Sequence, residues 1–143
     1  MTSSESGPSP YLVLVGHCTP DSGMLRSVIA QVAPKAMVVR VTTGSQLAEH
    51  RCPQAIWLVN RVLDGDFDSD DGMELIANTS ASPGAPTLLL ISNLPEAQTE
   101  AIRRGALLGF GKKALYADAT KAALARALEH ATSGGPPSSA NAT

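Results

Sequence analysis

The chain has 143 residues, of which 43% are hydrophobic and 17% are charged, and its formal net charge at pH 7 is -2. This size and composition fit one globular domain with a core of its own. The small negative charge and the 3% aromatic content argue against binding to nucleic acid or to an anionic membrane.

The amino-terminal residues carry no signal for export. Residues 1–10 are small and polar, with no basic stretch that leads into an apolar one. The longest apolar runs, such as Tyr11–Val15, are too short to cross a bilayer. Cys18 and Cys52 are the only cysteines, and we expect both to be reduced thiols. These features predict a cytoplasmic protein.

Short apolar runs recur along the chain and predict five strands. In chain order, these runs are Tyr11–Val15, Met37–Val41, Ile56–Val59, Thr87–Ile91 and Leu107–Phe110. They are continuous rather than alternating, which is typical of parallel strands buried on both faces. Helices are predicted between and after them, in chain order at residues 19–33, 45–50, 70–79, 95–104 and 117–131.

Strict alternation of strands and helices predicts an α/β fold, namely a doubly wound five-stranded parallel sheet with helices on both faces. The domain is predicted to span residues 10–132. A flexible segment, residues 1–9, precedes it, and a disordered tail, residues 133–143, follows it because the tail has too few apolar residues to fold. Ligands of such sheets bind beyond the carboxyl ends of the strands, so the loops there are the place to look for function.

Four stretches of the sequence, taken together and in order, resemble the receiver domain of two-component response regulators. They are Leu12–Val15, Ile56–Asn60, Asp71–Leu75 and Arg104–Ala106. The resemblance covers residues 10–132 and implies a (βα)5 flavodoxin-like, CheY-like sandwich. It also implies a stand-alone signalling module of a phosphorelay rather than an enzyme.

The resemblance implies an active site that this sequence lacks. Receivers carry an acidic pair after the first strand and an acceptor aspartate after the third, but here Gly16 and His17 stand for the pair and Asn60 for the acceptor. Mg²⁺ prefers carboxylate ligands, and an amide is too weak a nucleophile to form an acyl-phosphate. We therefore expect a degenerate pseudo-receiver with no cofactor, whose phosphorylation pocket is vestigial.

Two further positions of that pocket are kept. Ser92 matches the hydroxyl that receivers carry after the fourth strand. Either Lys112 or Lys113 matches the lysine after the fifth strand, because the stretch Leu107–Gly111 is one residue longer than usual. Without an acceptor, these groups have no phosphoryl oxygen to bind.

The acidic loop 64–71 contains the weak candidates for a metal site, Asp64, Asp66 and Asp68. No frame of this loop places glycine at the sixth position and glutamate at the twelfth, as a calcium loop requires. We expect a solvated loop that leads into the amino terminus of a helix.

We expect another protein as the partner, and a monomer or weak homodimer. In receivers, the face formed by the fourth helix, fifth strand and fifth helix meets partners, and here that region carries Arg103, Arg104, Lys112 and Tyr116. Two alternatives remain open. The chain could accept a phosphoryl group on an aspartate of loop 64–71, or it could be a small-ligand-binding α/β domain.

Overall fold

The computed structural model describes residues 10–132 and contains one five-stranded parallel sheet with the strand order β2-β1-β3-β4-β5. The strands are β1 (Tyr11–Val15), β2 (Val38–Val41), β3 (Ala55–Asn60), β4 (Thr87–Ile91) and β5 (Leu107–Phe110). This confirms the predicted fold class. The terminal segments 1–9 and 133–143 lie outside the described residues, so the predicted domain boundaries stay predictions.

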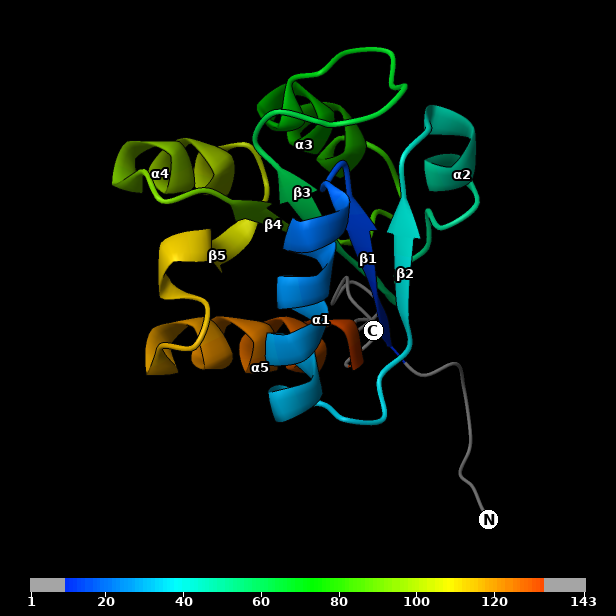
Figure 1. The fold of residues 1–143 in the computed structure, drawn as a ribbon. Coiled ribbons are helices and arrows are strands. Elements are labelled where there is room, and N and C mark those ends of the chain that lie inside the picture. The colour runs from blue at the N-terminus through cyan, green and yellow to red at the C-terminus, as the bar shows by residue number, and fades with distance from the viewer. Residues whose placement is uncertain (1–9, 133–143) are drawn as a thin grey trace, which may run out of the picture.

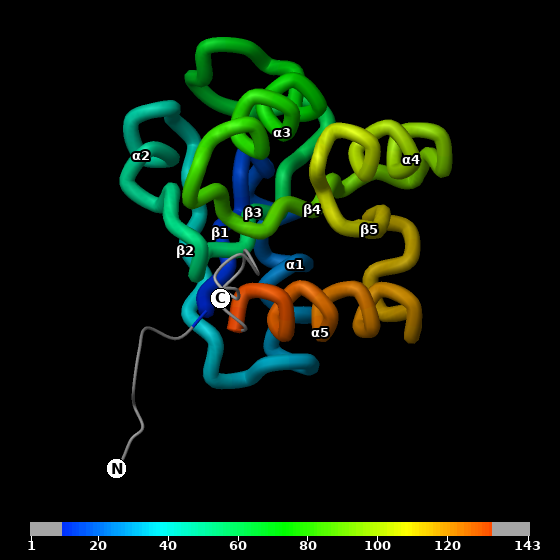
Figure 2. The backbone as a smooth tube through the Cα atoms, turned by 180° about the vertical axis from the view of Figure 1, so that it is seen from behind, coloured from blue at the N-terminus to red at the C-terminus, as the bar shows by residue number. Residues whose placement is uncertain are grey.

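Helices cover both faces of the sheet. They are α1 (Thr19–Val32), α2 (Gly44–Ala48), α3 (Gly72–Ser80), α4 (Pro95–Arg103) and α5 (Asp118–Thr132). Figures 1 and 2 show α2, α3 and α4 on one side of the sheet and α1 and α5 on the other. Within the described part of the chain, no helix has both the length and the apolar character that a bilayer crossing would need.

The central strand β3 shows why the sheet residues form unbroken apolar runs. Ile56 and Leu58 belong to the core cluster under α1 and α5, whereas Trp57 and Val59 belong to the cluster under α2, α3 and α4. Successive side chains of a strand point to opposite faces, so both must be apolar when both faces are covered. All four residues are at most 2% exposed.

The edge strand β5 contains a β-bulge, which accounts for the extra residue in its sequence. Leu89 pairs with Leu107 and Ile91 pairs with Phe110, so β5 has two residues where β4 has one. At the bulge, Gly109 lies so close to β4 that a Cβ atom would collide with the carbonyl oxygen of Leu90. The bulge sets which of the following lysines faces the sheet.

The buried side chain of Gln98, from α4, replaces the backbone hydrogen bonds that the bulge disrupts. Its Nε2 donates to the carbonyl oxygens of Leu90 (2.9 Å) and Ser92 (3.1 Å), and its Oε1 accepts from the Gly109 N–H (2.9 Å). Because buried backbone polar groups need partners, this one amide holds α4, β4 and β5 together.

The role of Gln98 predicts that Gln98→Leu lowers the free energy of unfolding by about 2 kcal/mol or more, since three backbone groups lose their partner inside the protein. Urea denaturation measures this change. As a control, Gln31→Leu on the exposed surface of α1 should change stability by no more than about 0.5 kcal/mol. Equal effects of the two variants would contradict the role assigned to Gln98.

Candidate functional site

The carboxyl ends of β1, β3 and β5 bring together residues that lie far apart in the sequence. The Asn60 side chain donates from Nδ2 to the carbonyl oxygen of Gly16 (2.9 Å), and its Oδ1 accepts from Lys112 Nζ (3.4 Å). The structure therefore places Gly16, Asn60 and Lys112 in one pocket, as the receiver resemblance implies. Here the amide of Asn60 acts as a cross-link between two strand ends.

The position of Gly16 has no room for a carboxylate side chain. Its φ angle is 72°, in the left-handed region that favours glycine. A Cβ atom at this position would lie 2.7 Å from the side chain and 2.9 Å from the Cα of Leu63, the first buried residue after β3. Leu63 thus occupies the space that an acidic residue at position 16 would need.

Asp21, in the first turn of α1, contributes a carboxylate to the pocket. Its Oδ2 accepts from Lys112 Nζ at 2.6 Å, and both side chains are about one quarter exposed. The hydrogen bond from Lys112 lowers the pKa of the Asp21 carboxyl below its usual value, against the opposing effect of partial burial. The ammonium group and the carboxylate therefore neutralise each other.

The two lysines after β5 have different surroundings. Lys113 is exposed, and its backbone N–H donates to Asn93 Oδ1 (3.0 Å), whereas the side chain of Lys112 reaches Asp21. Lys112 is therefore the pocket lysine. Ser92 stands at the end of β4, where its Oγ accepts from the Leu94 N–H (3.2 Å) and helps to start α4.

His17 is fully buried behind this pocket. Its Nε2 donates to the carbonyl oxygen of Leu58 (2.8 Å), while Nδ1 has no hydrogen-bond partner among residues 10–132. Burial is the main cause that lowers the pKa of His17 to about 4. The imidazole is therefore neutral at pH 7 and fills the interior beside the charged pair.

These residues do not fit the magnesium ion that the receiver resemblance implies. Mg²⁺ requires oxygen ligands in octahedral geometry. Gly16 offers no side chain, and the side-chain oxygens of Asn60 and Asp21 both face the ammonium group of Lys112. A cation placed among them would meet a positive charge already in position.

Backbone hydrogen bonds hold the acidic loop in place, and its aspartates are exposed. The Asp64 N–H donates to the Gly16 carbonyl oxygen (2.9 Å), and the Asp66 N–H donates to the Thr42 carbonyl oxygen (2.8 Å). Asp64, Asp66 and Asp68 are all exposed. In the part of the chain that the structure describes, no three His, Cys, Asp or Glu side chains converge on a site for an ion.

The candidate partner residues are only partly on one surface. Arg103 and Arg104 both pair with Glu100 on α4, each at 2.6 Å. The Tyr116 hydroxyl donates to Ser27 Oγ on α1 (3.0 Å). Of the four candidates, Lys112 directs its ammonium group into the pocket instead.

Sequence reasoning missed Asp21 and Arg40. Asp21 lies six residues beyond the end of β1, so a search of the positions directly after the strand did not reach it. Arg40 Nε donates to the His17 carbonyl oxygen (3.2 Å) from β2. Arg40 is a charged residue inside the otherwise apolar run Val38–Val41, and this exception to the pattern could have indicated that it has a role near the strand ends.

The buried state of His17 predicts how stability depends on pH. The unfolded chain takes up a proton at about pH 6.5, but folded His17 does so only at about pH 4, so stability is lost as the pH falls through this window. We expect a loss of about 2–3 kcal/mol between pH 7 and pH 4.5, and a much flatter profile in His17→Gln. Urea denaturation across this pH range measures both.

The control variant is Asp21→Asn, because a carboxyl with a lowered pKa loses its stabilising effect only below about pH 4. In Asp21→Asn, the free energy of unfolding should fall between pH 7 and pH 4.5 as steeply as it does in the unaltered protein. An unchanged slope in His17→Gln would show that other groups cause the pH dependence.

No family model matches the chain, and no curated protein matches its sequence. Solved structures do match. The signal receiver domain of a DNA-binding response regulator from Colwellia psychrerythraea has a TM-score of 0.63 at 14% identity, over 85% of this chain and 99% of that one. A response regulator receiver domain from Rhodospirillum rubrum has a TM-score of 0.59 at 11% identity, over 85% and 94%.

A third match is the protein NtrX from Brucella abortus, with a TM-score of 0.63 and 22% identity. The match covers 88% of this chain but only 28% of that longer one. All three identities are too low to carry function across, and they establish the architecture alone. The described chain has the fold of response-regulator receiver domains.

Proposed function

We propose that this chain is a receiver-like signalling module of the two-component type that works in the cytoplasm without being phosphorylated. The observation that carries this proposal is the packing of Leu63 against Gly16, which leaves no space for a metal-binding acid at position 16. The amide of Asn60 supports it, because an amide donates to the Gly16 carbonyl oxygen where a carboxylate would repel it.

The charge balance of the pocket supports the same proposal. Lys112 is held by Asp21, so the pocket already contains an anion for its lysine. Breaking a partly buried pair costs the attraction between its charges and the hydrogen bond between them. A phosphoryl group would have to displace the Asp21 carboxylate from Lys112.

The proposed output is contact with another protein through α4, β5 and α5. Two large apolar side chains are exposed in this region, Ile102 on α4 (45%) and Leu108 at the bulge of β5 (48%). Arg103 and Arg104 follow Ile102 in the chain, and both pair with Glu100. Apolar side chains beside arginine are the combination that protein interfaces favour. The proposal therefore describes a binding module rather than an enzyme.

The alternative of phosphorylation on another aspartate receives less support. The carboxylates of loop 64–71 are exposed and none has an ion pair among the described residues, while Lys112 is engaged elsewhere. Asp21 is close to the lysine but is bound by it, which lowers its nucleophilicity.

Incubation with acetyl phosphate and Mg²⁺, followed by intact-mass measurement, tests the missing chemistry. We expect no phosphoryl adduct on the unaltered protein, and none on Asn60→Asp, because Gly16 and Leu63 still prevent a metal-binding acid. A phosphorylatable receiver domain treated in parallel is the positive control. An adduct on the unaltered protein, mapped to Asp21 or to loop 64–71, would refute the proposal, and labelling of Asn60→Asp alone would refute our account of the pocket.

The interaction face predicts that Leu108→Lys weakens capture of a protein partner from native lysate. Placing a charge at the centre of an apolar contact commonly costs about 2 kcal/mol or more of binding free energy, roughly a thirtyfold loss of affinity. The matched control is Met37→Lys, since Met37 is 65% exposed and precedes β2, at the opposite edge of the sheet from β5. A partner that both variants retain equally would place the interface elsewhere.

A further inference from the structure

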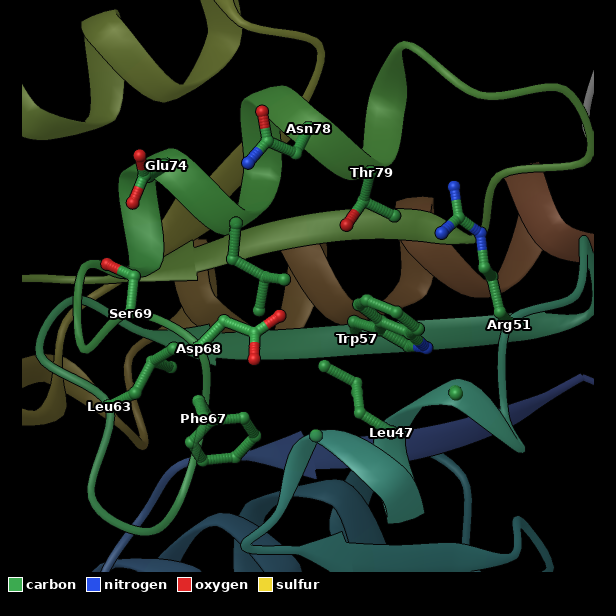
Figure 3. A pocket seen from close by; sticks show the side chains of 13 residues that line it. Leu47, Arg51, Trp57, Leu63, Phe67, Asp68, Ser69, Glu74, Asn78 and Thr79 are labelled. Atoms are coloured by element: carbon green, nitrogen blue, oxygen red, sulfur yellow. The ribbon is translucent and has the colours of Figure 1, made fainter.

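A cavity of about 290 Å³ opens between α2, α3 and the loop that follows β3. Its floor is the indole ring of Trp57, flanked by Leu47 and Leu63, and Phe67 from the acidic loop closes one side (Figure 3). The cavity lies beside α2, which has only five residues. Its size and apolar floor are typical of a small-molecule site.

One polar group inside this cavity lacks a partner. Thr79, on α3, is 3% exposed, and its hydroxyl makes no hydrogen bond with any residue between 10 and 132. Figure 3 shows this hydroxyl pointing toward the space above Trp57. Because this hydroxyl borders the open cavity, water or a hydrogen-bonding ligand there can pair with it.

The charged side chains around the cavity have opposite signs at its two ends. Arg51 lies at one end, and Asp68 and Glu74 lie at the other, with Trp57 between them (Figure 3). Within the described residues, none of the three takes part in a salt bridge. Arginine presents a planar fork of donors that matches a carboxylate, and the two acids repel a second anion at the far end.

From these groups we infer that the cavity binds a small aromatic carboxylate that carries an amine at the opposite end of its ring. The ring occupies the cavity against the partly exposed side chains of Phe67 and Leu75. The carboxylate meets Arg51 and the Thr79 hydroxyl, and the amine faces Asp68 and Glu74. Such a ligand combines aromatic contact with charge complementarity at both ends. The site is separate from the vestigial phosphorylation pocket and goes beyond the proposed function, because it adds a chemical input that needs no phosphoryl transfer.

Trp57 is the only tryptophan of the chain, so its indole N–H gives a single, self-assigned signal in a proton–nitrogen NMR spectrum. We expect this signal to shift on titration with para-aminomethylbenzoate. Two relatives with the same ring serve as comparisons. Para-aminomethylbenzamide lacks the negative charge, and terephthalate carries a second negative charge in place of the amine. Both should bind about fivefold or more weakly.

Variants test the residues at the charged and polar ends. Arg51→Gln should weaken para-aminomethylbenzoate about fivefold or more while leaving the affinity for the benzamide nearly unchanged. Thr79→Val should weaken it by a smaller factor, since it removes only the hydroxyl at constant shape. Arg126→Gln, an exposed arginine of α5 on the other face of the sheet, is the matched control and should bind as the unaltered protein does.

Several results would overturn this inference. If none of the three molecules shifts the Trp57 signal, the cavity does not bind this class of ligand. A cavity that instead accommodates a side chain of a partner protein would give this result. Equal affinity for the benzoate and the benzamide, equal affinity for the benzoate and terephthalate, or equal affinity of Arg51→Gln and Arg126→Gln would each remove the charge argument. These titrations use no phosphoryl donor, so their failure leaves the proposed function untouched.

Discussion

The carboxyl edge of the sheet is assembled around the backbone carbonyl of Gly16, which accepts from Asn60 Nδ2 and from the Asp64 N–H, both at 2.9 Å. These two hydrogen bonds join the end of β1 to the end of β3 and to the loop after it. They require the left-handed backbone of Gly16 and bring Leu63 against it. The absence of a metal-binding acid follows from this arrangement and not only from the choice of one residue.

Among the described residues, the polar side chains around that carbonyl are satisfied by one another, except for Nδ1 of His17. Asp21 and Lys112 neutralise each other, and burial keeps His17 neutral. Along the edge strand β5, the side chain of Gln98 likewise supplies hydrogen-bond partners for the backbone groups at the bulge. The strand ends are thus stabilised by internal polar contacts, which is consistent with a module whose function does not depend on capturing an ion there.

Much of the fold could be predicted because the strand and helix patterns are plain in the sequence. The five residues of β4 are all buried and four of them are apolar, and α1 ends before Pro34. The pocket was predictable only at the strand ends. The β-bulge in β5 determines whether Lys112 or Lys113 reaches the pocket, and no local sequence pattern reveals the register of that bulge. The cavity beside Trp57 was missed because Leu47, Trp57 and Thr79 come from three separate elements, and no local pattern shows that they line one space.

The contact between Gly16 and Leu63 has a consequence for how such a protein can evolve. A mutation that introduced an acid at position 16 would first meet a steric clash, while a mutation that removed Leu63 would first open a void in the core. Each step alone is harmful, so positions 16 and 63 can change only together. The contact therefore restricts variation at this end of the sheet and leaves the outer surfaces of the domain freer to change.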